Sequence, residues 1–437
     1  MWEAETTTDP RQPLSGEVGG SPLPACREAP TVLPVAIAAL RELVTMRSVR
    51  LLQVVGTLNP AYGGPCVVVN QLTRSLTDLG QSVEVVTLDP TSAPWLTELR
   101  EPPRAFGPAL GKYGLSRHLR RWLKLHVSDY DAVIVHGIWQ YQSQAVRAAC
   151  CRAGVPYFLF VHGAMDPWFR ERYPGKHAKK ALYWRLFEHR TLRDAQAVLY
   201  TSEEERRLAR TSFTPYRARE TIVGLGIDEP PGSPALQCEG FLSANPHLRD
   251  KRILLFLGRL HPKKGCDLLI EAFSRVCHRD DSLHLVVAGP DESETEAGLR
   301  MLAESLRVGD RITWIGMLNE DAKWGAYRAA DAFVLASHSE NFGIVIVEAL
   351  ACGLPVLISD KVNIWREIER CGAGLVEGDT TAGAASLLDR WMNMPDSDRT
   401  EMRRLARACF LDNFEARHAA MGFVTSIAAA IGKADIA

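Results

Sequence analysis

The 437-residue chain lacks several features that would each assign it to a class of protein. Its 10 cysteines include the adjacent pair Cys150 and Cys151 but no C-x-x-C spacing, so they predict neither a zinc site nor a planned set of disulfides. No run of about 18 apolar residues occurs, so no segment is expected to span a membrane as a helix. The composition, 46% hydrophobic and 24% charged, is ordinary for a globular protein with length for two domains. A reducing, cytoplasmic location is expected.

The small net charge hides an uneven distribution. Residues 47–220 carry a net charge of +10, residues 221–437 carry −8, and residues 1–46 carry −3. The basic first half indicates that an anionic partner, such as a membrane surface, approaches it, and a solvated basic face is the alternative. Residues 1–46 are expected to form a disordered extension. Met46, just before the first expected strand, is hypothesised to be the start of translation.

Short apolar strands alternate with glycine-containing loops and amphipathic helices, which is typical of an α/β fold with parallel strands. We expect strands at residues 49–55, 83–88, 132–135, 157–161, 252–257, 283–288, 312–315, 332–335 and 355–358. Residues 229–250 lose periodicity and gather Pro, Gly and Ser, which predicts an interdomain linker. The predicted domains are therefore Rossmann-like units at 47–228 and 251–405. A helical segment at 406–437 then returns to the first domain.

The turn after the expected strand at 332–335 carries two carboxylates. Glu340 precedes a helix expected to begin near Phe342, and Glu348 lies about two turns along that helix. The free N–H groups of a helix N-terminus favour phosphate, and Gly343 lets the backbone approach it. Since carboxylates would repel phosphate, we expect both to accept hydrogen bonds from hydroxyls at either end of a nucleotide sugar. A loop charge at Glu340 and a surface residue at Glu348 are the alternatives.

A second loop supplies positive charge to the acidic half. Gly258-Arg259 and Lys264-Gly265 follow the expected strand at 252–257 and precede a helix. The planar guanidinium of Arg259 and the ammonium of Lys264 can both reach a diphosphate. Two solvated loop cations are the alternative.

Two expected strands of the first half run directly into His-Gly pairs, His136-Gly137 and His162-Gly163. Ligands of parallel α/β sheets bind at the carboxyl ends of the strands, so both pairs are candidates. We prefer His162, with a structural role for His136. Between them, residues 115–127 predict an amphipathic helix whose basic face is either solvated or a membrane contact.

The ordered combination of these motifs resembles the group 1 glycosyltransferases, glycosyltransferase family 4, over roughly residues 49–420. It rests on Gly258-Arg259, Lys264-Gly265, Ala288-Gly289-Pro290, and Glu340 and Glu348 with seven residues between them. Further segments are similar to bacterial members that build surface polysaccharides. These are His162-Gly163-Ala164-Met165-Asp166-Pro167-Trp168, Lys179-Lys180, Ser202-Glu203 and Asn363-Ile364-Trp365-Arg366-Glu367.

The resemblance implies a GT-B architecture, in which two Rossmann-like domains face each other across a cleft. It implies retaining transfer of a hexosyl unit from a UDP- or GDP-sugar to a glycan or lipid-linked acceptor, in exopolysaccharide, capsule or lipopolysaccharide synthesis. It implies that no metal or other cofactor is required. The catalytic set would be Glu340, His162, Arg259 and Lys264. The donor-binding set would be Gly63, Gly64, Gly258, Arg259, Lys264, Gly289, Gly316, Met317, Glu340, Asn341, Phe342, Gly343, Ile344 and Glu348.

The sequence also bears on alternative reactions and partners. Asp129-Tyr130-Asp131 precedes a strand instead of following one, which disfavours a metal-bridged scheme and favours front-face attack by family analogy. A nucleotide-sugar 2-epimerase of the same architecture is the nearest alternative. A dehydrogenase is disfavoured because Gly56 and Gly63-Gly64 replace G-x-G-x-x-G, and a non-catalytic binding protein would not need Glu340 and Lys264. Peripheral contact with the inner membrane surface stays open, and no nucleic acid partner is expected.

Overall fold

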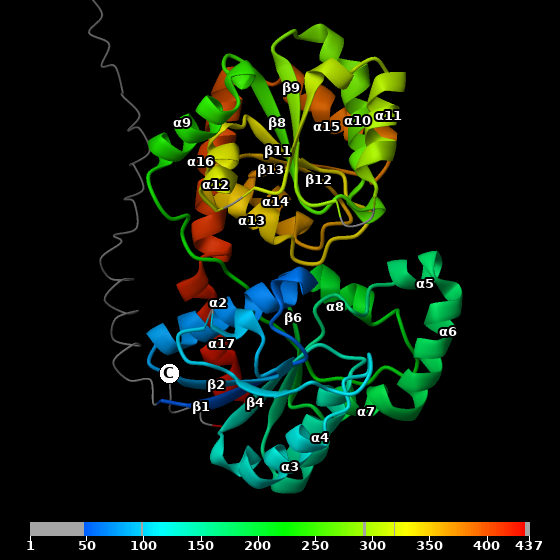
Figure 1. The fold of residues 1–437 in the computed structure, drawn as a ribbon, viewed down its shortest axis with the longest axis vertical. Coiled ribbons are helices and arrows are strands. Elements are labelled where there is room, and N and C mark those ends of the chain that lie inside the picture. The colour runs from blue at the N-terminus through cyan, green and yellow to red at the C-terminus, as the bar shows by residue number, and fades with distance from the viewer. Residues whose placement is uncertain (1–47, 98, 292–293, 319, 433–437) are drawn as a thin grey trace, which may run out of the picture. The chain divides into compact units, whose positions relative to one another are not determined.

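The computed structural model describes residues 48–97, 99–291, 294–318 and 320–432. The expected extension at 1–46, with Met46, and the last five residues of the predicted C-terminal segment lie outside the described residues. Two parallel sheets, each flanked by helices, make up the described chain (Figure 1). None of the helices in these ranges combines the length and apolar character needed to cross a membrane.

The first sheet has seven parallel strands in the order β3-β2-β1-β4-β5-β6-β7. The strands are β1 (Arg50–Val55), β2 (Ser82–Pro90), β3 (Arg104–Gly107), β4 (Ala132–His136), β5 (Tyr157–Phe160), β6 (Ala197–Tyr200) and β7 (Glu220–Ile222). All residues of β4 and β5 are buried, as expected for a parallel sheet covered on both faces. The strand order reverses between β1 and β4, so the loops that follow these two strands diverge and open a ligand-binding position.

Helices flank this sheet in the first domain. They are α2 (Gly64–Asp78), α3 (Arg117–His126), α4 (Tyr141–Ala153), α5 (Trp168–Arg172), α6 (Pro174–Tyr183), a π-helical turn η4 (Trp184–Glu188), α7 (His189–Asp194) and α8 (Glu203–Ala209). Helix α4 packs against both α3 and α7 (Figure 1). Ser116 caps α3 by accepting from the backbone N–H of Leu119 at 3.2 Å, which confirms the expected helix near its predicted start.

The second sheet has six parallel strands in the order β10-β9-β8-β11-β12-β13. The strands are β8 (Arg252–Leu257), β9 (Leu283–Ala288), β10 (Ile312–Gly316), β11 (Ala332–Leu335), β12 (Val356–Ser359) and β13 (Gly374–Glu377). Its helices are α10 (Cys266–Val276), α11 (Glu296–Ser305), α12 (Glu320–Ala329), α13 (Ile344–Ala351), α14 (Trp365–Cys371), α15 (Thr381–Asn393) and α16 (Asp396–Asn413). The order reverses between β8 and β11, which are the strands that precede the two predicted donor loops.

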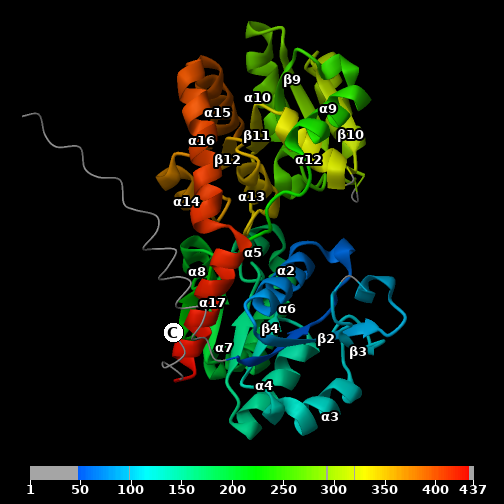
Figure 2. The ribbon, with the colours of Figure 1, turned by 90° about the vertical axis from the view of Figure 1, so that its left-hand side faces the viewer.

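The last helix, α17 (Ala416–Ala430), leaves the second domain and packs against α2 of the first, as the sequence predicted (Figure 2). Ile227, at the end of the first domain, pairs with Glu415 as an isolated parallel bridge. The predicted boundary at residue 406 is corrected, because it falls inside α16. The chain turns at Phe414, and Glu415 begins the new helix by accepting hydrogen bonds from the backbone N–H groups of Arg417 and His418.

The predicted linker at residues 229–250 is also corrected. Residues Pro234–Ala244 form helix α9, which packs against α12 of the second domain. A Cβ on Gly325 would lie 2.4 Å from the carbonyl oxygen of Gln237, so glycine permits this close helix contact. Only Gln237 and Phe241 of α9 are buried, which explains the weak apolar periodicity of the segment.

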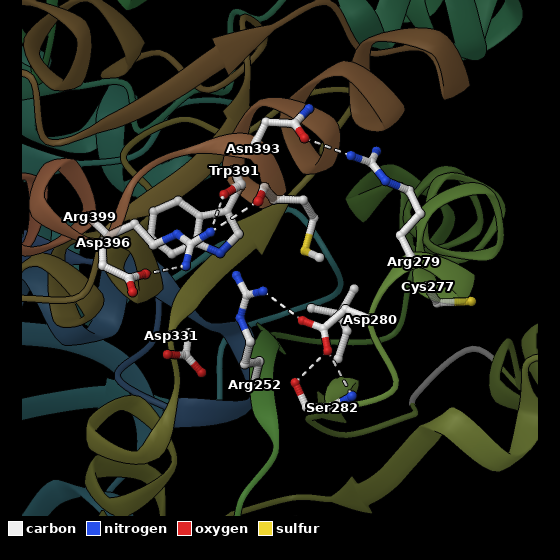
Figure 3. A network of polar contacts seen from close by, with 12 residues as sticks. Arg252, Cys277, Arg279, Asp280, Ser282, Asp331, Trp391, Asn393, Asp396 and Arg399 are labelled. Atoms are coloured by element: carbon white, nitrogen blue, oxygen red, sulfur yellow. Dashed lines mark hydrogen bonds and ion pairs between the residues drawn. The ribbon is translucent and has the colours of Figure 1, made fainter.

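A polar network joins elements at the amino-terminal end of the second sheet (Figure 3). Arg252 donates to Asp280 at 2.6 Å, and Asp280 also accepts from the backbone and hydroxyl of Ser282 at 2.8 and 2.6 Å. Nearby, Arg399 donates to Asp396 at 2.8 Å. Arg252 is the first residue of β8, so this network lies at the strand ends opposite the ligand-binding edge and supports the fold.

Candidate active site

Three loops of the second sheet lie in backbone contact at its carboxyl edge. A Cβ on Gly265, where φ is +63°, would lie 2.0 Å from the carbonyl oxygen of Ala336 after β11. A Cβ on Gly289, where φ is +134°, would lie 1.9 Å from the carbonyl oxygen of Gly258 after β8. Any larger residue would push these loops apart. The predicted Gly258–Gly265 loop and the loop that carries Glu340 are therefore neighbours.

An ion pair between Lys264 and Glu340 lies where these loops meet. The Lys264 ammonium donates to the Glu340 carboxylate, and their side chains are only 15% and 18% exposed. Burial acts to raise the pKa of Glu340, but Lys264, Lys263 and Arg259 outweigh it, and the pKa lies below its ordinary value. Glu340 is therefore ionised at neutral pH, next to three cations.

The tip of helix α13 adjoins this ion pair. Gly343 stands at the N-cap position with φ +70°, and no side chain caps the helix. A Cβ on Gly343 would lie 3.3 Å from Cγ of Glu340. Phe342 is buried against Phe414, with ring centroids 5.9 Å apart, so its backbone and not its ring faces a ligand. The tip therefore presents backbone N–H groups beside the three cations.

Glu348 is buried on α13 and has two partners that sequence reasoning missed. Lys323 donates to one carboxylate oxygen at 2.7 Å, and the Tyr327 hydroxyl donates to the other at 2.9 Å. Both partners come from α12, four residues apart, and that helical spacing is the signal in the sequence. Glu348 is thus neither a surface residue nor free of partners in the described chain.

The remaining predicted donor residues lie along the edges of this region. Gly63 (φ +80°) precedes Gly64, the first residue of α2, and a Cβ on Gly64 would lie 3.9 Å from Cδ1 of Ile344. The first-domain glycine pair therefore faces the tip of α13. Gly316 ends β10 with φ +75°, and its carbonyl accepts from the backbone of Gly289 at 2.7 Å. Met317 directly follows β10, an edge strand two positions from β8 in the sheet, and is 80% exposed.

The loop after β5 in the first domain contacts the Glu340 loop. A Cβ on Gly163 would lie 2.9 Å from Cβ of Asn341, and Ser339 donates to Asp166. The backbone N–H of Gly163 donates to Glu205 at 2.7 Å. These contacts place the His162 segment directly beside the predicted donor loop.

Lys263 is a third residue that sequence reasoning passed over. Its ammonium lies 5.6 and 5.4 Å from the ring centroids of Trp168 and Phe169 in the first domain. Burial lowers the pKa of Lys263, against the opposing charges of Glu340 and Asp166 and with a smaller contribution from Lys264 and Arg259. Lys263 therefore contacts both the first domain and the charged loop. Arg259 itself is exposed at this edge.

His136 and His162, the two candidate histidines of the first domain, form one hydrogen-bonded pair. Nδ1 of His136 lies 3.0 Å from Nε2 of His162, and Nε2 of His136 lies 2.8 Å from Oε1 of Gln53. Both histidines line a cavity of about 600 Å³ in the first domain, at the carboxyl ends of β1, β4 and β5. Burial lowers the pKa of His162 to about 4, so the pair is neutral at physiological pH.

Comparison with known proteins identifies the family. The chain matches the family model "Glycosyl transferase 4-like domain" over residues 63–226 and the model "Glycosyl transferases group 1" over residues 242–408. A D-inositol 3-phosphate glycosyltransferase of Frankia alni is 30% identical over 370 residues, which cover 76% of this chain and 86% of the relative. The chain belongs to the group 1 glycosyltransferases.

Other relatives of this glycosyltransferase agree in fold. A mannosylfructose-phosphate synthase of Agrobacterium fabrum is 26% identical over 70% of this chain and 73% of its own. A crystal structure of Anabaena Alr3699/HepE in complex with UDP and glucose has a TM-score of 0.67 at 17% identity, with 87% of this chain and 99% of that chain covered. A sucrose-phosphate synthase from Thermosynechococcus elongatus has a TM-score of 0.67 at 19% identity, with coverage of 88% and 100%. The glycosyltransferase therefore has the GT-B architecture.

Within the described ranges, the glycosyltransferase has no group of three or more His, Cys, Asp or Glu side chains placed to hold a metal ion. Metal independence, the retaining outcome and the role in surface-polysaccharide synthesis stay predictions.

Proposed function

We propose that this glycosyltransferase moves a hexosyl unit from a UDP- or GDP-sugar to a glycan or lipid-linked acceptor, with retention of anomeric configuration. The observation that carries the proposal is the Lys264–Glu340 ion pair beside the uncapped tip of α13, at the switch point of the second sheet. Cations and helix-tip N–H groups suit a diphosphate, and two carboxylates on flanking positions suit hydroxyls. The UDP-glucose complex of Alr3699/HepE supports a nucleotide-sugar donor.

Each group has a distinct task in this scheme. Arg259, Lys264 and the tip at Gly343 stabilise the charge that grows on the departing diphosphate. Glu340 accepts a hydrogen bond from the transferred sugar, and Glu348, held by Lys323 and Tyr327, accepts from the ribose diol. The bond from the anomeric carbon to the diphosphate oxygen breaks, and a bond to the acceptor oxygen forms on the same face. The acceptor proton passes to the departing phosphate oxygen. Arg259, Lys264 and the helix tip take the place that a metal ion would have at the diphosphate.

The first-domain cavity is the proposed acceptor site. Its lining is mixed, and the polar side chains in it include Asp89, Lys112, Gln140 and His162, which can hydrogen-bond to hydroxyls. It adjoins the predicted donor loop through Gly163 and Asn341. These groups support a glycan or lipid-linked sugar as acceptor, and surface-polysaccharide synthesis as the setting rests on the family resemblance alone.

A basic groove supports the further expectation of a cytoplasmic enzyme in peripheral contact with a membrane. The groove runs between α3 and α4 over a floor of alanines, and its cations are Arg117, Arg120, Arg121, Lys124 and Arg152. None of these five side chains has an ion pair or hydrogen bond within the described ranges. Leu125 nearby is 63% exposed, which suits the interface of an anionic bilayer better than a soluble polyanion.

Product analysis tests the transfer reaction. The purified protein is first screened by thermal shift with UDP, GDP and their sugars, since a ligand at 100 times its Kd stabilises by about 2.7 kcal/mol. The stabilising donor is then incubated with free and lipid-linked sugars, and the new anomeric signal is read by NMR. A product with the donor's anomeric configuration is expected. Release of an epimerised free sugar without acceptor would establish the 2-epimerase alternative, and inversion would overturn the front-face scheme.

Vesicle flotation tests the membrane contact independently. The protein should float with vesicles of equal parts phosphatidylcholine and phosphatidylglycerol and not with phosphatidylcholine alone. The double variant Arg120→Glu and Arg121→Glu should weaken vesicle binding by roughly tenfold or more for each substituted site. A basic residue near an anionic surface contributes about 1 kcal/mol, and each substitution also adds a negative charge. Arg404→Glu on α16, also an exposed arginine, is the matched control. Equal flotation of all three proteins would refute the role of the groove.

A further inference from the structure

The histidine pair is the end of a longer hydrogen-bond relay that begins on helix α2. The Thr73 hydroxyl donates to the carbonyl of Val69 at 2.7 Å, one helical turn earlier. Nε2 of Gln53 lies 2.8 Å from the same hydroxyl oxygen. A hydroxyl has one proton to donate, so Thr73 accepts from Gln53 and fixes its amide with the nitrogen toward α2.

The direction of the relay then follows step by step. The Gln53 oxygen faces His136, so Nε2 of His136 carries the proton and donates at 2.8 Å. A neutral imidazole carries a single proton, so Nδ1 of His136 is the acceptor in its 3.0 Å contact with His162. His162 consequently carries its proton on Nε2. Its other nitrogen, Nδ1, keeps a lone pair, and no residue in the described ranges is its hydrogen-bond partner.

Packing holds the relay rigid. The ring of Phe160 stacks on His136 and on His162, with centroids 5.3 and 5.1 Å away. Phe423 of the returning helix α17 stacks behind Phe160 at 5.9 Å with an interplanar angle of 5°. His162 itself has φ +49°, a left-handed conformation that costs energy for a non-glycine residue. The structure therefore holds this ring in one orientation at a cost.

We propose that Thr73, Gln53 and His136 are positioning residues that hold His162 as the Nε2-protonated tautomer, so that its Nδ1 accepts a hydrogen bond from a hydroxyl of the bound carbohydrate. The proposal rests on the glycosyl transfer proposed above for its ligand. It explains why two His-Gly pairs end neighbouring strands, because both nitrogens of His136 are engaged within the relay and only His162 keeps one for the ligand. It also explains a buried glutamine in the middle of β1, where an apolar residue would otherwise be expected.

The charged groups around the pair define its pH behaviour. Asp89 and Lys112 line the same cavity, and Glu205 accepts from the backbone of Gly163 beside His162. Burial lowers the pKa of both histidines, that of His162 to about 4. The wild-type relay therefore keeps its proton arrangement through the neutral range.

Nuclear magnetic resonance reads the tautomer directly. Protein labelled with ¹⁵N at its 12 histidines is recorded in long-range ¹H–¹⁵N spectra, and His136→Asn and His162→Asn variants assign the two rings. Both rings should be neutral and protonated on Nε2. Protonation of His162 on Nδ1 would mean that Gln53 is reversed and would overturn the proposal. This measurement needs no substrate, so it stands or falls separately from the proposed reaction.

Matched variants on α2 test the consequence for catalysis. Thr73→Val removes the group that orients Gln53, and turnover should fall roughly tenfold, as for loss of one hydrogen bond. Thr73→Ser should restore it. Thr77→Val is the control, because Thr77 makes the same bond to a carbonyl one turn earlier, at 2.8 Å, without contacting Gln53. Affinity for the bare nucleoside diphosphate should be unchanged in all three. Equal turnover of Thr73→Val and Thr77→Val would refute the relay.

Gln53→Glu tests the same relay through pH. A carboxylate at this position still accepts from His136 but raises its pKa, and a protonated His136 donates from both nitrogens. Nδ1 of His136 would then donate to His162 and force its proton onto the ligand-facing nitrogen. Turnover of Gln53→Glu should therefore fall on acidification through the neutral range, where the wild type shows no such step. An unchanged pH profile in a folded variant would contradict the proposal.

Discussion

Replacing Gly163 by alanine adds one methyl group where the first domain meets the donor loop. The new Cβ would lie 2.9 Å from Cβ, 3.0 Å from Cγ and 3.2 Å from Oδ1 of Asn341. Ordinary carbon contacts are about 3.5–4.0 Å, so Asn341 must move by roughly 0.5–1 Å. Asn341 directly follows Glu340, so this movement shifts the carboxylate and the tip of α13 together.

The expected effect has two separable parts. Gly163 has φ +70°, and a residue with a Cβ in this conformation destabilises the fold by about 1–2 kcal/mol. The displacement of the donor loop should in addition lower kcat by about 10- to 100-fold, since a 1 Å misplacement can cost two orders of magnitude. Chemical denaturation measures the first part, and steady-state transfer assays measure the second.

Gly154→Ala, at the C-terminal end of α4, is the matched control. Gly154 has φ +72°, and a Cβ there would meet no atom within 4 Å. It should therefore lose similar stability and keep its turnover. If both variants keep normal kcat, or both lose it equally, the contact between Gly163 and Asn341 does not position the site.

Three further predictions concern the charged groups. Glu340→Ala and Lys264→Ala should each lower kcat by about two orders of magnitude or more, as for loss of a transition-state contact, and near-normal kinetics in folded variants would defeat the site assignment. EDTA should leave the transfer rate unchanged, and strict dependence on added Mg²⁺ or Mn²⁺ would rule out the metal-free scheme. Burial raises the pKa of Glu188 from 4.5 to about 7, so the folded state keeps a proton that the unfolded state loses. The contribution of Glu188 to the free energy of unfolding should therefore fall by about 3 kcal/mol as pH rises from about 4.5 to 7. It is measured as the difference between the wild type and Glu188→Gln at each pH, because the buried histidines His136 and His162 titrate in the opposite sense. A difference that stays constant between the two ends of the range would contradict the prediction.

Local patterns in the sequence were sufficient for most of the fold. The expected strand at 132–135 is observed as β4, and the strand at 252–257 as β8. The edge strands β3 and β7 were not predicted because neither contains a buried residue to mark it, whereas the buried four-residue strand β11 was predicted. The buried strand β6 inside the first sheet was also missed. Helix α9 was missed for a related reason, since its contact with α12 buries only two of its residues.

Some residues of the candidate site could likewise be predicted from the sequence, and others could not. The loops with Lys264 and Glu340 were found because glycine, charge and strand ends coincide within a few residues. The partners of Glu348 on α12 were not found, because Lys323 and Tyr327 meet it only through packing of two separate helices. The sequence favoured His162 over His136, but it gave no sign of the hydrogen bond that makes the two rings one unit.

The sequence by itself determined the two parallel α/β domains, the loops at their strand ends and the family resemblance, because these depend on residue order over short distances. Only the tertiary structure decided that Gly163 lies beside Asn341, that Gln53 contacts His136, and that Phe423 returns to stack on Phe160. Each of these contacts joins residues far apart in the chain. Their proton positions and distances follow from how the sheets and the last helix pack, which no local pattern encodes.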